Sequence, residues 1–342
     1  MSTTTAKPHP STNRKFTLAA RPVGMPKISD FQIVTEPLPQ LGEGQILVRT
    51  QYLSVDPYMR GRMNGVRTYA DPVNIGQMMV GGAVGEVVES RNGDFRPGEI
   101  ITGYWGWQEF AISDGTGLRK IDTTLAPPST ALGVLGMPGM TAYFGFLEIC
   151  QPKQGETVVV SGAAGAVGSL VGQIAKIKGC SAVGTAGSDA KVDWITRELG
   201  FDAAFNYKTT DNYVERLKDL CPNGIDCYFD NVGGALTDAI FPVLNTKSRI
   251  AICGQISQYN SPKPQSGAPV FSYLLTKSAR AEGFLVYNFA DRFAGGMAQM
   301  AKWVKEGKIK YRETIVEGFE NAPRALIGVL SGENTGKMIV KV

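Results

Sequence analysis

Three glycines mark the place in the sequence where the backbone could hold a phosphate group. Gly162, Gly165 and Gly168 lie three residues apart, after the apolar run Thr157–Ser161 and before an amphipathic segment. Such a turn lets a strand enter a helix sharply, and it offers a pyrophosphate the unpaired N–H groups and positive dipole end of that helix. The spacing is GxxGxxG rather than GxGxxG, but its position between a strand and a helix is the context that the motif needs. The sequence therefore predicts a dinucleotide-binding turn; the alternative is a set of glycines needed only for turning and packing.

The end of the next predicted strand indicates which dinucleotide would bind. A site that prefers NAD usually carries an acidic residue about 20 residues after the glycine turn, where it bonds the ribose hydroxyl. Here the strand Ala182–Thr185 ends without an acid at its tip, and Lys191 follows. A missing acid and a nearby lysine suit the 2′-phosphate of NADP. The alternative for Lys191 alone is an ordinary solvated helix lysine.

The sequence lacks the residues that several other kinds of site need. The single histidine, His9, lies in a polar N-terminal segment, and none of the five cysteines is spaced as CxxC. This argues against a histidine-dependent triad and a histidine-ligated metal. Scattered cysteines without a signal peptide predict a reduced, cytoplasmic protein. The balance of 35 Lys plus Arg against 31 Asp plus Glu is too even to imply nucleic acid or a membrane surface. The uncharged stretch 131–147 is broken by Gly and Pro, so we expect a buried segment and not a membrane span.

The remaining patterns predict the elements that position these residues. At roughly 150 residues per domain, a chain of 342 residues suggests two domains. Short strand-like runs separated by turns predict a mainly β domain from Lys15 to about Ile121. Apolar strands alternating with helical patterns over 156–284 predict a doubly wound α/β domain with a parallel sheet. Short β signals return after about Trp303, so the C-terminal segment can rejoin the first domain. The strands predicted for the parallel sheet are Thr157–Ser161, Ala182–Thr185, Ala203–Tyr207, Asp226–Asp230, Arg249–Cys253 and Phe284–Val286.

Five segments occur in order along the chain: VDPYMRGRM (55–63), GMPGMTAYFG (136–145), SGAAGAVGSLVGQIAK (161–176), CYFDNVGG (227–234) and CGQISQYN (253–260). Together they resemble one family, the zinc-free branch of the medium-chain dehydrogenases/reductases that reduces carbon–carbon double bonds. This branch includes prostaglandin/leukotriene reductases, plant 2-alkenal reductases and bacterial curcumin-type reductases. The resemblance implies a GroES-like substrate domain over 14–130 and 308–342, a Rossmann NADP-binding domain over 131–307, and a homodimer. The polar residues 1–13 are expected to be a disordered tail.

The resemblance also implies which residues bind the cofactor NADPH and the substrate. They match the family's pyrophosphate turn, 2′-phosphate lysine, adenosine-end tyrosine, cofactor-lining segments and nicotinamide-side asparagine. In chain order the cofactor residues are Gly165, Ala166, Val167, Gly168, Lys191, Tyr207, Asn231, Cys253, Gly254, Gln255, Ile256, Ser257, Tyr259, Phe284, Leu285, Val286 and Asn334. Tyr58 and Tyr259 match the substrate-side tyrosines. One departure is Ser181, where family members often carry a basic residue.

The reaction that the resemblance implies needs neither a metal nor a histidine. A hydride adds to the β carbon of an α,β-unsaturated carbonyl, and hydrogen-bond donors stabilise the charge that develops on the carbonyl oxygen. Tyrosine hydroxyls suit this task because they stay protonated at neutral pH. Tyr259 follows the predicted strand Arg249–Cys253, at the sheet edge where ligands bind, and Tyr58 comes from the other domain. We expect both to be catalytic; the alternative is two packed tyrosines with satisfied hydroxyls. Whether Tyr259 donates the proton or only a hydrogen bond stays open.

Three functions are therefore weighed. The first is NADPH-dependent reduction of the carbon–carbon double bond of α,β-unsaturated ketones or aldehydes. The second is a zinc-free NADPH quinone reductase on the same scaffold, and the third is an NADPH-binding sensor without turnover. The aromatic residues Tyr104, Trp105 and Trp107 either belong to a core or form an apolar wall for a hydrophobic enone.

Overall fold

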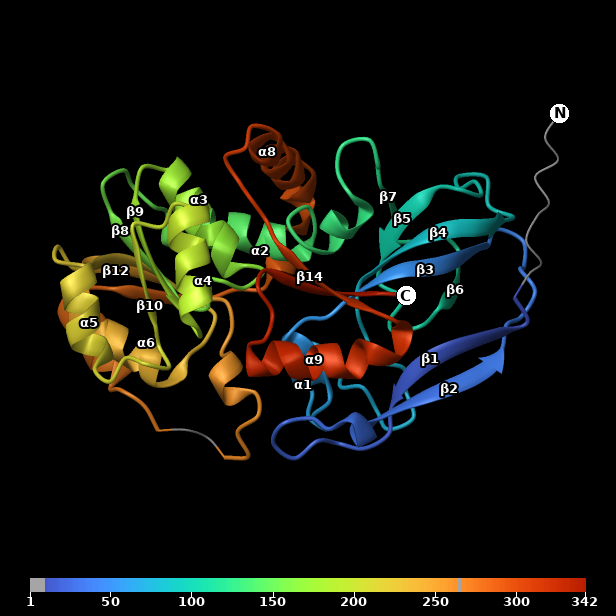
Figure 1. The fold of residues 1–342 in the computed structure, drawn as a ribbon, viewed down its shortest axis with the longest axis horizontal. Helices are drawn as coiled ribbons and strands as arrows, with labels where there is room; N and C mark the ends of the chain where they lie inside the picture. Colours follow the sequence, from blue (N-terminus) through green and yellow to red (C-terminus); the bar gives the residue numbers. More distant parts are fainter. Residues whose placement is uncertain (1–9, 264–265) are drawn as a thin grey trace.

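The computed structural model describes residues 10–263 and 266–342. Figure 1 shows two bodies side by side, with an antiparallel β body built mostly from the first third of the chain and an α/β body built from its middle. The last strands return to the β body, and the helices α1 (Tyr58–Arg62) and α9 (Ala322–Ser331) lie between the two.

The α/β body contains six parallel strands. They are β8 (Thr157–Val160), β9 (Ser181–Ala186), β10 (Ala203–Asn206), β11 (Ile225–Asp230), β12 (Leu244–Ile252) and β13 (Arg280–Gly283). Their order in the sheet is β10-β9-β8-β11-β12-β13. This is the 3-2-1-4-5-6 order of a doubly wound Rossmann sheet, so the predicted fold class is confirmed.

One predicted strand of this sheet is wrong. The last strand is Arg280–Gly283, and Phe284–Val286 lies just beyond it. The run is apolar for another reason, because part of it packs inside: the Phe284 ring lies 6.1 Å from the ring of Phe229 and Val286 is buried, although Leu285 is exposed. The true strand has the sequence RAEG, whose polar character suits an edge of the sheet.

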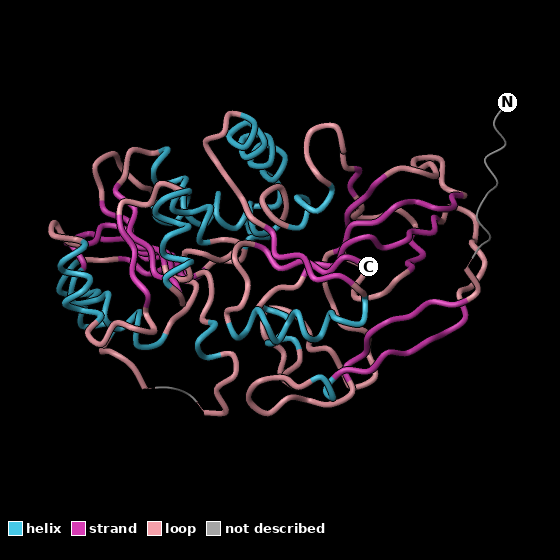
Figure 2. Tube along the Cα trace, in the orientation of Figure 1, coloured by secondary structure: helices cyan, strands magenta, loops and turns pink. Residues whose placement is uncertain are grey.

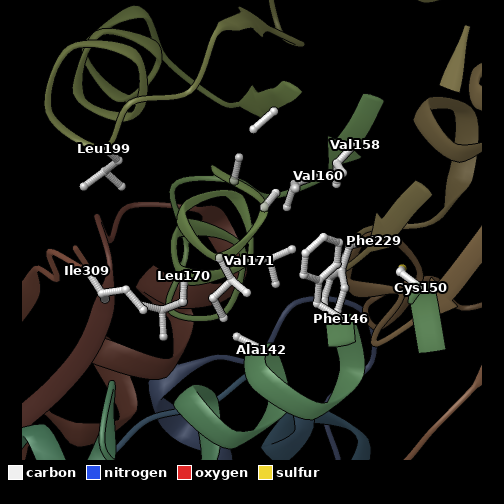
Figure 3. Packing of buried hydrophobic residues seen from close by; sticks show 14 of the residues in the cluster. Ala142, Phe146, Cys150, Val158, Val160, Leu170, Val171, Leu199, Phe229 and Ile309 are labelled. Carbon is white, nitrogen blue, oxygen red and sulfur yellow. The ribbon is translucent and has the colours of Figure 1, made fainter. Parts of the chain in front are cut away.

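Helices cover the parallel sheet on both faces, as Figure 2 shows. The helices of this body are α2 (Met137–Phe144), α3 (Gly168–Ile177), α4 (Asp189–Asp193), α5 (Tyr213–Leu220), α6 (Gly234–Ile240), α7 (Val270–Lys277) and α8 (Phe293–Lys305), of which α8 packs on α2. Leu170, Val171 and Ile174 of α3 are buried, as their helical spacing predicts. They pack toward β8 and α2 in the largest core cluster (Figure 3). This packing fixes the start of α3, where the glycine turn lies.

The C-terminal strands complete the sheet of the β body. Its sheet runs in the order β14-β15-β3-β4-β5-β7, with β6 beside β3, and the hairpin β1-β2 forms a second sheet that shares its core. The strands are β1 (Thr12–Leu18), β2 (Phe31–Pro37), β3 (Ile46–Ser54), β4 (Ala83–Ser90), β5 (Ile100–Gly103), β6 (Phe110–Ser113), β7 (Arg119–Lys120), β14 (Glu313–Glu317) and β15 (Lys337–Lys341). Because Ile339 pairs with Ser54, the C-terminal strand meets the segment that leads into α1.

The structure can be compared with two expectations, one for the polar N-terminal segment and one for the uncharged stretch 131–147. Strand β1 begins at Thr12, so the last two residues of the expected tail 1–13 are in a strand, while 1–9 lie outside the described residues. Within the described ranges, no helix has the length and apolar character needed to cross a membrane. The uncharged stretch 131–147 is divided among a 3₁₀ turn (Pro128–Leu132), α2 and a following π turn (Gly145–Cys150).

Candidate active site

The glycine turn forms a cradle for an anion. Gly162 has a φ of +60°, and a Cβ at Gly168 would lie 2.4 Å from the Gly162 carbonyl oxygen, so a side chain does not fit there. The backbone N–H groups of Val167 and Gly168 form no hydrogen bond with any described residue. Unpaired donors at the start of a packed helix are what a pyrophosphate needs, so the cradle fits this group.

The C-terminal segment touches this cradle directly. Gly336 pairs with Gly165, and its N–H donates to the Ala164 carbonyl over 2.8 Å. The Asn334 amide donates to the Gly336 carbonyl over 2.6 Å, which places Asn334 beside the turn. Since Lys337 follows in β15, one short segment joins the glycine turn to the β body.

Two lysines follow the neighbouring strands β9 and β10: Lys191 lies in α4 after β9, and Lys208 comes just after β10. Ser188 caps α4, and the Lys191 ammonium donates to the Gly332 carbonyl over 2.6 Å. Burial lowers the pKa of Lys191, and the charge of Lys208 lowers it further. The Tyr207 hydroxyl lies over Gly187, where a Cβ would be 2.9 Å from it. The sequence analysis predicted a role for Lys191 and Tyr207 but did not consider Lys208, although it directly follows Tyr207.

The ends of β11 and β12 form one hydrogen-bonded edge. The Asn231 amide donates to the Ser161 carbonyl over 2.7 Å at the end of β8. The segment 253–257 is held against this edge by backbone bonds, among them that from the Cys253 N–H to the Asp230 carbonyl over 2.8 Å. Burial raises the pKa of Cys253 to about 12, so its thiol stays protonated. The segment predicted to line a cofactor therefore lies at the carboxyl end of the sheet, beside the glycine turn.

The Tyr259 side chain folds back over this edge, and its hydroxyl proton has no acceptor among the described residues. Its hydroxyl oxygen accepts the Gln255 N–H over 3.2 Å, and no described residue accepts a hydrogen bond from the hydroxyl itself. Burial raises the pKa of Tyr259, so the hydroxyl stays protonated at neutral pH. Tyr259 is thus a free donor at the sheet edge where ligands bind in such folds.

Tyr58 opens α1 in the β body, and its hydroxyl lies 2.5 Å from that of Tyr104. Burial raises the pKa of Tyr58 well above its usual value, and the charge of Asp56 raises it further. Burial also raises the pKa of Tyr104 to about 12. Tyr104 is 52% exposed, whereas Trp107 is fully buried. Of the aromatic cluster, Tyr104 therefore lies at the surface as a partner of Tyr58, a contact that the sequence analysis did not predict, and Trp107 belongs to the core.

The two tyrosine segments meet across the body interface. The Arg60 Nε donates to the Asn260 side-chain oxygen over 3.0 Å, so the residue two places after Tyr58 holds the residue next to Tyr259. Tyr58 and Tyr259 form no hydrogen bond with each other. The structure thus brings the segments that carry the two predicted donors into contact, while the two hydroxyls form no hydrogen bond with each other.

The segment Phe284–Val286 is placed differently from the other predicted cofactor residues. A Cβ at Gly145 would lie 2.1 Å from the Phe284 ring, which shows how deeply this ring is packed. Val286 is buried, and only Leu285 is exposed, at 39%. Contact of a ligand with Phe284 or Val286 would therefore involve their backbone.

An apolar cavity of about 290 Å³ adjoins Tyr104. It is lined by Met78, Met79, Val80, Tyr104, Trp105, Gly106 and Gln108. The Trp105 indole N–H donates to the Thr50 hydroxyl over 3.0 Å, so this ring presents its apolar surface in a fixed position. The cavity suits an apolar group attached to a substrate held at Tyr58.

Comparison with known proteins identifies relatives along nearly the whole chain. Residues 14–121 match a family model described as the N-terminal domain of oxidoreductase, and residues 166–303 match one described as zinc-binding dehydrogenase. Over the described residues, no group of three or more His, Cys, Asp or Glu could hold a metal ion. The second model's description therefore has no counterpart in a zinc site within those residues.

Individual relatives are close. The chain is 47% identical to the NADPH-dependent curcumin reductase of Escherichia coli over 335 residues, which cover 96% of this chain and 97% of that protein. It is 49% identical to prostaglandin reductase 1 of Bos taurus over 338 residues, covering 96% and 98%. The crystal structure of CurA from Vibrio vulnificus in complex with NADPH superimposes with a TM-score of 0.92 at 46% identity, covering 96% and 99%. With its GroES-like β body and Rossmann body, the chain belongs to the zinc-free, alkenal double bond reductase branch of the medium-chain dehydrogenase/reductase family.

Proposed function

We propose that this chain uses NADPH to reduce the carbon–carbon double bond of α,β-unsaturated ketones and aldehydes. The observation that carries the proposal is the free hydroxyl proton of Tyr259 at the same sheet edge as the unpaired N–H groups of the glycine turn. The relatives named as NADPH-dependent curcumin reductase and prostaglandin reductase 1 support it, since both match nearly the whole chain.

The residues that would hold NADPH follow the edge of the parallel sheet. Residues 165–168 would bind the pyrophosphate, and Lys191 with Lys208 would bind the 2′-phosphate. Tyr207 would pack at the adenosine end, while Asn231, the segment 253–257, the backbone of 284–286 and Asn334 would line the rest. When bound, NADPH supplies a hydride to the β carbon of the substrate.

The hydroxyls of Tyr259 and Tyr58 would act on the substrate carbonyl oxygen. Each is a donor whose pKa is raised by burial, so each keeps its proton at neutral and mildly alkaline pH. A hydrogen bond from either one stabilises the negative charge as it develops on that oxygen. Tyr104 would hold the Tyr58 hydroxyl in place from the solvent side.

The test is NADPH oxidation against a graded panel of enones, enals and quinones, with identification of the product. The proposal expects saturated ketones or aldehydes from enones and enals. Turnover of quinones without enones would instead identify a quinone reductase. A change of NADPH fluorescence on binding, without oxidation by any substrate, would identify a sensor.

The cofactor preference gives a first prediction. Lys191→Ala removes a charged donor to the 2′-phosphate, so KM for NADPH should rise about 10- to 100-fold while KM for NADH changes little. Lys218→Ala is the matched control, because Lys218 is an exposed lysine paired with Glu215 on α5. Steady-state kinetics with both cofactors make the measurement, and equal efficiency with NADPH and NADH in the unmodified protein would contradict the preference.

We also propose the domain division 14–130 with 308–342 and 131–307, a homodimer and a cytoplasmic location. The pairing of β15 with β3 supports the discontinuous first domain. For the dimer, β13 is an open edge of the parallel sheet, and Phe271 and Leu275 of α7 are 88% and 80% exposed. The five cysteines are free thiols, which suits a reducing compartment. Light scattering of the pure protein tests the dimer.

A further inference from the structure

The guanidinium of Arg60 joins α1 to two segments that are distant in the sequence. Arg60 is 3% exposed and lies two residues after Tyr58. Its Nη2 donates to the Gly24 carbonyl over 2.9 Å, and its Nε donates to the Asn260 side-chain oxygen over 3.0 Å. The side chain of Asn64, just after α1, accepts a further bond over 2.6 Å. Because a buried charge left without acceptors is costly, the guanidinium holds each of these neutral partners in place.

The Asn260 side chain is bound through both of its polar atoms by the β body. Its oxygen accepts from Arg60, and its amide nitrogen donates to the Met25 sulfur over 3.4 Å. A Cβ at Gly24 would lie 3.9 Å from the Asn260 carbonyl oxygen, so the backbones of the two segments are also close. Between the described residues of 14–121 and 253–263, these two side-chain bonds are the only hydrogen bonds. The polar connection of the turn that carries Tyr259 to this part of the β body therefore runs through one side chain.

The loop that receives Asn260 is itself braced. Arg21, near the start of this loop, donates to the carbonyls of Met63 and Val73 over 2.9 and 3.2 Å. Arg60 holds the same loop from α1. Two arginines thus fix the loop against α1 and the chain that follows it, so the loop offers Asn260 a fixed point of attachment.

Tyr259 and Asn260 belong to one compact turn. The 3₁₀ helix Ile256–Gln258 leads into Tyr259, and the Ser261 N–H donates back to the carbonyl of the last residue of that helix over 2.9 Å. The Tyr259 hydroxyl oxygen in turn accepts the Gln255 N–H. Because both side chains leave the same closed turn, fixing the Asn260 side chain restricts the position of the Tyr259 ring.

The turn is fastened at two places with different neighbours. On the sheet side, the Ser257 hydroxyl and N–H both donate to the Val232 carbonyl, over 2.6 and 3.1 Å. On the side of the β body, the Asn260 side chain fastens it to Arg60 and Met25. Loss of the Asn260 side chain would leave the sheet anchor intact and release only the part of the turn that carries Tyr259.

We propose that Asn260 is a positioning residue that holds the Tyr259 hydroxyl in the orientation needed to donate to the substrate carbonyl. Because its partner Arg60 shares α1 with Tyr58, the same contact sets the two donor-bearing segments relative to each other. A donor stabilises developing charge most when it is oriented before the reaction, so a released turn costs turnover. This inference rests on the proposed enone reduction and adds a residue that controls it through Tyr259.

The first measurement compares variants at one position. Asn260→Ala should lower kcat for enone reduction about 10-fold while Kd for NADPH stays within about twofold, because the sheet anchor remains. Asn260→Asp keeps an acceptor for the Arg60 Nε, so its kcat should stay within about threefold of the unmodified value. Ser261→Ala is the matched control in the same turn, because the Ser261 hydroxyl donates to the Lys263 carbonyl over 2.7 Å and not to the β body. It should leave kcat unchanged.

A double-mutant cycle with Tyr259→Phe tests whether Asn260 acts through the Tyr259 hydroxyl. In the Tyr259→Phe background, Asn260→Ala should change kcat by less than about twofold, because the hydroxyl that it positions is gone. A merely structural role would lower kcat by the same factor in both backgrounds. Steady-state NADPH oxidation gives kcat for all four proteins, and fluorescence titration gives their Kd for NADPH.

The outcomes separate this inference from the proposed function. The role of Asn260 is overturned, and enone reduction stands, if kcat is unchanged in Asn260→Ala or in Tyr259→Phe, or if the loss is equal in both backgrounds. An Asn260→Asp variant as slow as Asn260→Ala also overturns it, and so does a loss of NADPH affinity in Asn260→Ala that matches the loss in kcat. An unmodified protein that reduces no enone overturns the proposed function and this inference together.

Discussion

The double variant Tyr58→Phe/Tyr259→Phe should lose at least about 10²-fold in kcat for enone reduction while it still binds NADPH. Removal of one donor directed at a developing oxyanion costs about this much in other enzymes. Both hydroxyls are protonated and lie in segments that meet across the body interface, and the Tyr259 proton has no acceptor among the described residues. Stopped-flow or steady-state measurement of NADPH oxidation gives kcat, and fluorescence titration gives NADPH affinity.

The single variants Tyr58→Phe and Tyr259→Phe show which role each hydroxyl has. Removal of a hydroxyl that donates to the carbonyl oxygen should by itself lower kcat. Removal of a hydroxyl that only positions the substrate should mainly raise KM. Tyr273→Phe is the matched control, because the Tyr273 ring stacks on Phe241 at a centroid distance of 5.8 Å in another cluster of the parallel-sheet body. A double variant with unchanged kcat would show that neither hydroxyl is catalytic.

Features set by local pattern were predictable from the sequence. The glycine turn was placed correctly because each part of it, an apolar strand, spaced glycines and an amphipathic helix, is contiguous. The run Phe284–Val286 shows the limit of this reasoning. A short apolar run is compatible with a strand or with an irregular segment packed inside, and only tertiary packing against Phe229 and Gly145 decides between them.

The site itself depends on contacts between distant segments, which a local pattern does not contain. Tyr58 was identified through its motif, but its pairing with Tyr104 follows from how the loops of the β body come together. Arg60 and Arg62 look alike in the sequence, and only the structure shows that the Arg60 guanidinium has several partners whereas that of Arg62 has no hydrogen-bond partner among the described residues. The role of Lys337 also cannot be read from the sequence, because its partner lies in a distant part of the chain.

A buried ion pair holds the segment that leads into α1. The Lys337 ammonium lies 3.1 Å from the Asp56 carboxylate, and their side chains are only 4% and 7% exposed. The ammonium also donates to the carbonyls of Val55 and Met338 over 2.7 and 2.8 Å, which uses all three of its protons. The Ser54 hydroxyl donates to the other oxygen of Asp56. Because Lys337 follows Gly336, this pair also fixes the β body against the glycine turn.

Lys337→Met should therefore lower the free energy of unfolding by about 3–5 kcal/mol, because it leaves the Asp56 carboxylate buried with only a serine as partner. Lys341→Met in the same strand is the control. Lys341 pairs with Glu317 over 3.3 Å, but these side chains are 49% and 70% exposed, so its loss should cost less than about 1 kcal/mol. Urea unfolding followed by circular dichroism gives both values.

The double variant Asp56→Asn/Lys337→Met separates the charge pair from simple packing. If the loss in Lys337→Met comes from an unpaired buried carboxylate, then neutralising that carboxylate should recover part of the lost stability, and the two changes should be strongly non-additive. If it comes from lost packing of the lysine chain, the double variant should be less stable than either single variant. Additive losses would therefore contradict the assignment of Asp56 and Lys337 as an interdependent pair beneath Tyr58.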